Sequence, residues 1–377
     1  MRLVREQICE SASRKLSNSL PTFGSVTATI GLDGFVDEII AVVDKRLDQD
    51  RYEPMKTITV LGDKILAAAG QSSNYELLVK QTKLGGNGPI MANALAAAGL
   101  AVTYVGNLGY PTLHPVFSEL ARRAKVISIA EPGHTDALEF EDGKLMLGKH
   151  QSLGDITWDN LLKRVGTDQL KSLIGAAKLV GMVNWTMLPH MSEIWTKLQS
   201  EILPQCPKQD RTLFIDLADP EKRTANDISN ALKILARFQS SINVILGLNL
   251  KESDQIAHAL GLGAPADSEP AIEQTARAIR EKLGISCVVI HPRKGAAAAT
   301  ADESASFAGP FVQQPKISTG AGDHFNAGFC LGRIMGLNLE ESLCAGVGTS
   351  GYYVRSAHSP TGKELAEFIA KLPPPQG

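Results

Sequence analysis

The sequence predicts an α/β fold of three layers, α/β/α, in which helices cover both faces of a mainly parallel β-sheet. Short apolar segments alternate with helical patterns from about residue 88 onward, which is the rhythm of a parallel sheet with crossover helices. The apolar segments are mostly continuous, as expected of strands covered on both faces. Residues 38–84 and 136–150 differ, because they carry short strand-like pieces among polar stretches. They predict a small β-sheet inserted into the larger domain.

The elements follow one another in a regular order. An amphipathic pattern over residues 3–20 predicts a helix within an N-terminal helical extension of residues 1–25, and residues 26–377 form the α/β domain. The inserted sheet is expected to use strand-like pieces at 38–43, 57–61 and 76–81 and a hairpin at 138–147. Strands of the main sheet are expected at 26–30, 102–105, 178–183, 213–216, 244–248 and 287–291. Helices are expected at 89–98, 115–123, 191–201, 225–237, 253–260, 271–283, 323–336, 339–355 and 361–371.

Composition narrows the class of partner. The chain has 377 residues, 38 Lys plus Arg against 40 acids, and a net charge of −2. This balance argues against nucleic acid or an acidic membrane and favours a small-molecule partner. Five cysteines, without a Cys-x-x-Cys pair, indicate free thiols in a reducing compartment. The N-terminus carries no apolar leader, so we expect a cytoplasmic protein.

The most informative stretch is Thr319-Gly320-Ala321-Gly322-Asp323, directly before an apolar helical run. Glycines before a helix let backbone N–H groups converge on one point, and the helix start adds unpaired donors. We therefore expect an anion-binding turn that holds phosphate. An acid at that position would repel phosphate unless it has a chemical role, and a general base that deprotonates an attacking hydroxyl is such a role.

Two other interpretations of this stretch are open. Asp323 is also an ordinary first-turn residue, which satisfies free amides and suits the helix dipole. A Gly-x-Gly before a helix also occurs in dinucleotide-binding folds, but here Phe325 stands at the third glycine position. The dinucleotide interpretation therefore fits poorly.

Two further patterns predict a binding site. Asp33 and Asp37 follow the first strand, and carboxylates at the carboxyl end of a strand face the usual ligand crevice of an open α/β sheet. Such acids can bind sugar hydroxyls, although a turn acid can also cap its own backbone. Gly85-Gly86-Asn87 precedes an alanine-rich helix, which permits close approach of a ligand to the backbone but also suits a plain tight turn.

The chain resembles the ribokinase-like (PfkB) carbohydrate kinases, whose signature is Asp-Thr-x-Gly-Ala-Gly-Asp-x-Phe. Gly320 to Phe325 match its last six positions, and Ser318 replaces the threonine. The resemblance spans roughly residues 26–370. It implies a ribokinase-like fold in which the inserted sheet is a lid over the sugar. It also implies ATP- and magnesium-dependent phosphorylation of an alcohol group on a small carbohydrate-like substrate, with Asp323 as general base, and it allows a homodimer joined through the lid.

The resemblance also assigns individual residues. Asn249 and Glu252 match an Asn-x-x-Glu element that binds magnesium and phosphates, although an N-cap and its N3 partner give the same pattern. Gly295 matches a glycine of the nucleotide turn, where Arg293 or Lys294 could reach a phosphate or lie in solvent as part of a basic turn. Asp216 begins an Asp-x-x-Asp-Pro sequence found in some members. Ile317 stands where many members have an aspartate that helps bind a monovalent cation, so the resemblance does not extend to potassium dependence.

One difference concerns the acceptor. Gly85, Gly86 and Ala92 match a Gly-Gly-x-x-x-Asn-x-Ala element, but Ile90 stands where the sugar-binding asparagine belongs, and Asn87 or Asn93 could supply an amide instead. We therefore expect ribose and fructose to be poor substrates and a deoxy sugar, nucleoside or polyol to be better ones. The alternatives are a nucleoside kinase of the same family and a non-catalytic ligand-binding or regulatory protein on this scaffold.

Overall fold

A nine-stranded, mainly parallel sheet forms the centre of the molecule. The computed structural model describes residues 4–263 and 269–375. Across the sheet the strands lie in the order β14-β13-β12-β11-β10-β9-β1-β5-β6, and only β13 and β14 pair antiparallel to their neighbours. All six strands predicted for this sheet are present. The strand bounds are β1 Thr27–Leu32, β5 Ala101–Gly106, β6 Lys125–Ser128, β9 Leu179–Val183, β10 Thr212–Asp216, β11 Asn243–Leu248, β12 Cys287–Ile290, β13 Gly295–Ala299 and β14 Ser304–Ala308.

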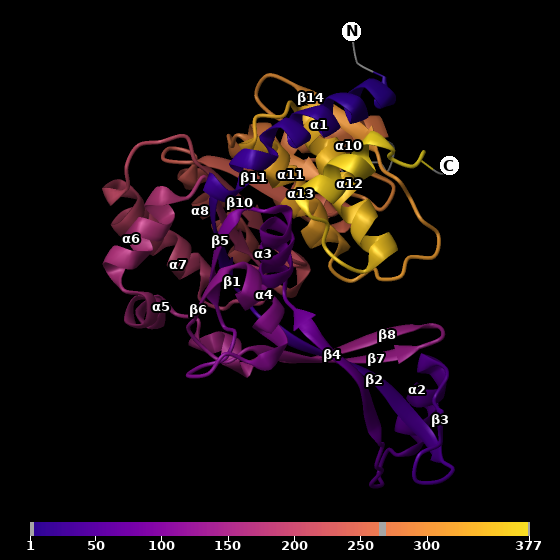
Figure 1. Ribbon diagram of the computed structural model, residues 1–377. Coiled ribbons are helices and arrows are strands. Elements are labelled where there is room, and N and C mark those ends of the chain that lie inside the picture. The colour runs from indigo at the N-terminus through magenta and orange to yellow at the C-terminus, as the bar shows by residue number, and fades with distance from the viewer. Residues whose placement is uncertain (1–3, 264–268, 376–377) are drawn as a thin grey trace.

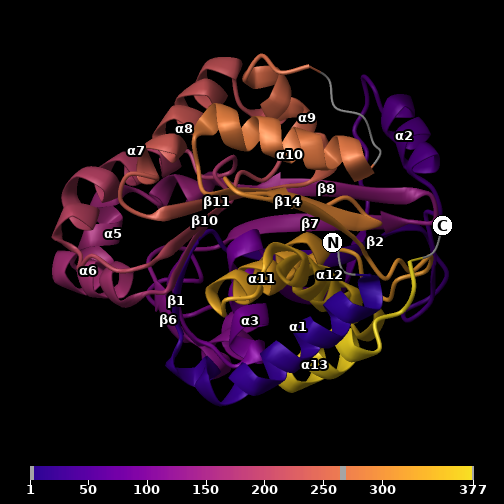
Figure 2. The same ribbon diagram turned by 90° about the horizontal axis from the view of Figure 1, so that it is seen from above.

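Helices cover both faces of this sheet, as predicted (Figure 2). One face carries α5 Trp158–Val165, α6 Thr167–Ala176, α7 Met191–Lys197, α8 Ala225–Phe238, α9 Leu250–Ala259 and α10 Glu269–Leu283. The other face carries α1 Arg5–Ser19, α3 Asn87–Ala98, α4 Ser118–Arg123, α11 Ala321–Ile334, α12 Leu339–Ser356 and α13 Gly362–Ala370. The sequence prediction lacked α5 and α6. The N-terminal helix α1 buries Ile8, Cys9, Ala12 and Leu16 in the same apolar cluster as α12 and α13.

A second, smaller sheet projects from one side of the body (Figure 1). It contains β2 Phe35–Arg46, β3 Tyr52–Pro54, β4 Leu77–Gly85, β7 Gly133–Phe140 and β8 Gly143–Lys149, with β2 paired to β3, β4 and β7. We call this sheet, together with helix α2 Ile58–Ala67, the lid.

The strand expected at residues 57–61 is wrong, because this segment begins helix α2. The hydroxyl of Thr57 accepts a hydrogen bond from the amide of Val60, which is the contact of a helix N-cap. Leu61 then packs against Ile40 and Leu138 on one face of the lid sheet. A threonine followed by apolar residues has the composition of a β-strand. Here the N-cap hydrogen bond of Thr57 starts a helix instead.

The chain order fixes where a ligand can lie. The chain runs from β1 outward to β5 and β6, and then returns to β9 on the other side of β1. Connections therefore leave the carboxyl ends of β1 and β9 in opposite directions, which opens a crevice at that point of a parallel sheet. No helix in residues 4–263 and 269–375 is long and apolar enough to span a membrane.

Candidate active site

The carboxylate of Asp33 lies at the switch point between β1 and β9. Asp33 is fully buried and follows β1, whereas Asn184 follows β9 with a left-handed φ of 64°. The Asp33 carboxylate accepts hydrogen bonds from Asn184 Nδ2 at 2.8 Å and from the amides of Asn87 at 3.0 Å and Gly88 at 2.8 Å. Desolvation raises its pKa to about 6, against the effect of these bonds. Asp33 therefore binds the first turn of α3 and holds it at the crevice.

Asp37 lies at the root of the lid, on β2 opposite Lys83 of β4. Its carboxyl oxygens and carbon stand only 2.4–2.5 Å from where a side chain on Gly85 would begin, so this position admits only glycine. Gly86, with φ of 96°, similarly faces Asp33. Burial raises the pKa of Asp37, while the charge of Lys83 and a hydrogen bond with Thr135 lower it. Of the two acids considered, Asp37 has fewer backbone amides bound to its carboxylate.

The predicted anion turn, residues 318–322, leads into α11. Gly320 adopts a left-handed φ of 88°, as its position before the helix requires. The Ala321 amide donates to Ser318 O at 3.2 Å and closes the turn. In the described part of the chain the amides of Gly320 and Gly322 donate to no protein acceptor. These two donors, together with the positive end of α11, form a site for an anion.

Asp323 occupies the first turn of α11, directly beside these amides. Its side chain is 8% exposed, and its Oδ1 accepts a hydrogen bond of 2.9 Å from Asn87 Nδ2. Desolvation raises the pKa of Asp323 to about 8, the Asn87 bond lowers it, and the charges of Asp33 and Glu252 raise it further. A carboxyl with a pKa near neutrality, fixed next to an anion site, is suited to accept a proton.

Asn249 and Glu252 form a capping box at the start of α9. Asn249 Oδ1 accepts from the Glu252 amide at 2.9 Å, and Glu252 Oε2 accepts from the Asn249 amide at 2.8 Å. Glu252 Oε1 also accepts from the amide of Asp219 at 2.8 Å. Both side chains therefore have a structural role. Their oxygens retain further lone pairs that can accept hydrogen bonds from water.

Three acids lie close together beneath this helix start. The pKa of Asp216 is raised well above its usual value by burial and then by the charges of Glu252 and Asp323. Asn326 Nδ2 donates to Asp216 Oδ2 at 2.9 Å. Among the described residues no set of three or more His, Cys, Asp or Glu side chains is placed to ligate a metal ion directly. The cluster fits Mg²⁺, which keeps several waters and needs only one or two protein carboxylates beside substrate phosphates.

A cavity of about 700 Å³ lies against the anion turn and contains most of the residues predicted for nucleotide binding. Asn249, Arg293, Gly295, Thr319 and Gly322 all line it. Apolar side chains form the remaining wall, among them Phe311, Val347 and Val354. Glu252 does not line the cavity and is joined to Asn249 through the capping box. A large cavity with phosphate donors at one end and apolar residues along its length has the shape of a nucleotide site.

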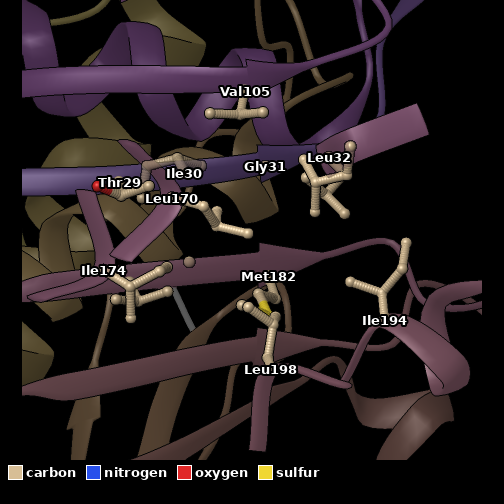
Figure 3. A pocket seen from close by; sticks show the side chains of 13 residues that line it. Thr29, Ile30, Gly31, Leu32, Val105, Leu170, Ile174, Met182, Ile194 and Leu198 are labelled. Carbon is tan, nitrogen blue, oxygen red and sulfur yellow. The ribbon is translucent and has the colours of Figure 1, made fainter. Parts of the chain in front are cut away.

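Another cavity lies within the core and has a different character (Figure 3). It measures about 30 Å³, and almost all of its 13 lining residues are apolar, including Ile30, Leu170, Ile174 and Met182. Thr29 is the exception, and its hydroxyl donates to Leu173 O. The cavity is too small for a sugar and offers no polar group for one. It is a packing defect between the sheet and its helices.

Ile90 and the two candidate asparagines, Asn87 and Asn93, have different contacts. Ile90 packs against the anion turn, since its methyl groups stand 3.2 and 3.3 Å from where a side chain on Gly320 would begin. Asn87 bonds to Asp323, whereas Asn93 accepts a bond from Arg123 on an exposed surface. The amide near the base therefore comes from Asn87.

Sequence reasoning missed Asn184 and Tyr104. The hydroxyl of Tyr104 donates to Asp33 O, and Asn184 spans the crevice to the same residue. The signal available for Asn184 was a polar residue directly after a buried strand. Tyr104 carried no such signal, because an aromatic residue within an apolar strand is common.

The titration of Asp323 yields a prediction about stability. A carboxyl whose pKa is raised on folding, here to about 8, stabilises the protein fully below its unfolded pKa of about 4. That contribution is lost as pH rises through the folded pKa. Urea unfolding of wild type should therefore weaken between pH 5 and pH 9 relative to Asp323→Asn, which should be the more stable protein at the upper end.

Asp302→Asn is the matched control, because Asp302 is an exposed acid. That variant should follow wild type across the same pH range. A wild type whose stability difference from Asp323→Asn does not change with pH would contradict the raised pKa.

Comparisons with known proteins identify the family of the chain. Residues 5–372 match the family model of prokaryotic ketohexokinase. A ketohexokinase of Haloferax volcanii is 29% identical over 342 residues, which cover 90% of each chain. Among solved structures, an Arabidopsis thaliana ribokinase bound to ribose and ATP has a TM-score of 0.61 at 17% identity and covers 91% of this chain and 98% of its own.

Two further solved structures show the same fold. Phosphofructokinase-2 of Escherichia coli has a TM-score of 0.62 at 15% identity, covering 92% of this chain and 99% of its own. A nucleoside kinase of Methanocaldococcus jannaschii has a TM-score of 0.59 at 13% identity, covering 92% and 98%. The fold, the signature around Asp323 and the family match together lead to one conclusion: the chain belongs to the prokaryotic ketohexokinase family of ribokinase-like (PfkB) carbohydrate kinases and is a phosphotransferase with an alcohol group as acceptor.

Proposed function

We propose that this protein transfers the γ-phosphoryl group of ATP to a hydroxyl of a ketohexose, with fructose as the leading candidate. The single observation that carries the proposal is the position of Asp323, a buried carboxyl beside the free amides of Gly320 and Gly322. A base and an anion site at this separation allow a hydroxyl and a phosphoryl group to meet in line. Family membership supplies the class of sugar.

The chain's own residues account for each part of the transfer. Asp323 accepts the proton of the attacking hydroxyl as the new oxygen–phosphorus bond forms and the bond from the γ-phosphorus to the bridging oxygen of ADP breaks. The amides of Gly320 and Gly322 bind the oxygens of the transferring group. Asn87 orients the carboxylate through its bond to Oδ1 and leaves Oδ2 for the substrate. Donors fixed before the reaction need no reorganisation during it.

Asn249 and Glu252 are the residues that would hold Mg²⁺, through water, at the phosphate end of the cavity. When bound, the ion would neutralise charge between the β- and γ-phosphates. The three mutually repelling acids Asp216, Glu252 and Asp323 favour a divalent cation there. Arg293 and Gly295, on the cavity wall, would contact the nucleotide.

The sugar would lie between the lid root and Asp323. Asp37 would bind its hydroxyls, while Asp33 holds α3 in place; Gly85 and Gly86 leave room for the carboxylates of Asp37 and Asp33. This proposal replaces the expectation that fructose is a poor substrate. That expectation assumed that Ile90 faces the sugar without an amide nearby, whereas Ile90 packs on Gly320 and Asn87 supplies an amide at the base.

A panel of acceptors tests the proposal directly. Purified protein with ATP and Mg²⁺ should phosphorylate D-fructose with a kcat/KM at least tenfold above that for D-ribose, D-glucose and inosine. Asp323→Asn should retain ATP binding and lose turnover by roughly 10²–10⁴-fold, since it cannot accept the proton. Asp302→Asn should behave as wild type.

Each alternative has its own outcome in this assay. Preferential phosphorylation of inosine would indicate a nucleoside kinase. Phosphorylation of fructose by Asp323→Asn at more than about a tenth of the wild-type rate would remove Asp323 from the role of base.

The magnesium assignment is tested with Glu252→Gln. We expect the Mg²⁺ concentration for half-maximal activity to rise about 10-fold or more, because outer ligands typically change metal affinity by that factor. Glu341→Gln is the matched control, because Glu341 is also a buried capping-box glutamate, at the start of α12. Equal Mg²⁺ titrations for the two variants would show that Glu252 acts only as a cap.

An exposed methionine on the lid sheet supports a proposed homodimer joined through the lid. Helix α2 packs on the face that carries Ile40 and Leu138. The opposite face carries Met146, which pairs with the buried Ala137 and is 51% exposed. We propose that the lid of a second copy covers this face.

Analytical ultracentrifugation should find wild type dimeric and Met146→Glu monomeric, because a buried charge would oppose association. Leu66→Glu, at an exposed apolar position on α2, should remain dimeric. A monomeric wild type at micromolar concentration would contradict the dimer.

A further inference from the structure

A cluster of neutral side chains that the proposed chemistry does not use forms hydrogen bonds with the backbone carbonyls of the anion turn. Tyr353, on α12, donates from its hydroxyl to Thr319 O at 3.0 Å. His324 follows the proposed base, and its ring stacks on Tyr353 at 3.6 Å with an interplanar angle of 13°. His324 Nδ1 lies 2.7 Å from Gly320 O, and its Nε2 lies 2.9 Å from Ser359 Oγ. All three side chains are buried.

The tautomer of His324 follows from these partners. A carbonyl oxygen only accepts hydrogen bonds, so Nδ1 must carry the proton that points at Gly320 O. Nε2 is then an acceptor, and the hydroxyl of Ser359 donates to it. Burial lowers the pKa of His324 to about 4, which keeps the ring neutral and leaves it this single proton. The result is a directed chain from Ser359 through His324 to the Gly320 carbonyl.

These bonds fix the direction of one anion donor, the Gly320 amide, and the closure of the turn. In a trans peptide the C=O and N–H groups point in opposite directions and move as one plane. Tyr353 holds the carbonyl of Thr319, so it also sets the direction of the Gly320 amide, which is free for an anion. His324 holds the next peptide plane through Gly320 O. The amide of that plane, from Ala321, closes the turn onto Ser318 O.

The turn is also confined sterically. A side chain beginning at Gly320 would lie 3.4 Å from the Tyr353 hydroxyl and 3.2 Å from Ile90 Cγ2. The glycine is therefore enclosed between α12 and α3. Burial, followed by the charge of Asp323, raises the pKa of Tyr353 to about 12, so its hydroxyl remains a donor at any physiological pH.

We propose that Tyr353 and His324 are positioning residues for phosphoryl transfer, which aim the anion turn without touching substrate. The proposal rests on the proposed function of that turn. It assigns a kinetic role to two buried side chains, 29 residues apart in sequence, that would otherwise be regarded as helix packing. Loss of either contact should destabilise the transition state more than the ground state. The charge on the transferring phosphoryl group depends most on the orientation of the Gly320 amide in the transition state.

The first test compares Tyr353→Phe with Tyr352→Phe. Both variants lose one phenol hydroxyl from α12, but the Tyr352 hydroxyl bonds to His358 and Glu364, away from the turn. Tyr353→Phe should lower kcat by about 3- to 30-fold, as expected for one well-aimed hydrogen bond, with the KM for sugar changed less than about twofold. Tyr352→Phe should leave both constants near wild type. Equal kcat values for the two variants, or a change confined to KM, would overturn the proposal.

The second test replaces His324 with asparagine or glutamine, whose side-chain amides can each occupy the position of one ring nitrogen. The Nδ2 of asparagine can replace Nδ1–H toward Gly320 O, whereas glutamine extends its amide toward the position of Nε2. His324→Asn should therefore keep a several-fold higher kcat than His324→Gln. Equal losses in the two variants would assign the ring to packing alone.

Hydrogen exchange supplies a readout that does not depend on turnover. Amide hydrogen exchange in peptides covering residues 318–324 should be faster in Tyr353→Phe than in Tyr352→Phe. The comparison is made at the same interval below each variant's unfolding temperature, so that a difference in global stability does not contribute. Unchanged exchange there would overturn the proposal even if kcat fell. If wild type phosphorylates another acceptor instead of fructose, the proposed substrate fails, and the same variant ratios measured on that acceptor still decide the positioning role.

Discussion

The buried carboxylate of Asp33 is the interaction on which the arrangement of the site depends. It lies at the topological switch point, where β1 and β9 diverge, and connects both strands to the first turn of α3. Burial of an unpaired carboxylate would cost several kcal/mol. Three N–H donors offset this cost, since a hydrogen bond to a charged group contributes about 1.5–3 kcal/mol. Because Asp33 fixes Asn87, it also fixes the side chain that orients Asp323 on α11, more than 200 residues later.

Three acids of the crevice are matched with a side-chain amide rather than with a cationic side chain. Asn184 bonds to Asp33, Asn87 to Asp323 and Asn326 to Asp216. An arginine or lysine in these places would orient the acids equally well but would lower their pKa values and cancel their charge. A neutral amide fixes geometry without adding a positive charge that would lower the pKa. The pKa values of Asp216 and Asp323 are therefore raised, first by burial and then by the charges of neighbouring acids.

The sequence carried the local features of this site but not its cross-connections. Strand positions were predictable because continuous apolar runs such as β11 and β12 report burial on both faces. Strands β13 and β14 were missed, since alanine, glycine and serine give no strand signal. The anion turn and its acid were predictable because glycines and a helix start are adjacent in sequence. The sequence could not show that the carboxylate of Asp33, rather than that of Asp37, accepts several N–H hydrogen bonds, one of them from Asn184. These contacts depend on strand order, which no local pattern encodes.

Ile90 illustrates why a motif position cannot be interpreted without its neighbours. The sequence interpretation assigned the lost amide to the sugar, but the isoleucine packs on the anion turn opposite Tyr353. Asn87 lies three residues before Ile90, so both side chains project from the same face of α3. One contacts the base and the other contacts the turn beside it. Asn87 therefore places its amide at Asp323, one helical turn before Ile90, and Ile90 packs against the glycine turn opposite α12. A single helix face thus contacts both the carboxylate of Asp323 and the glycine turn beside it.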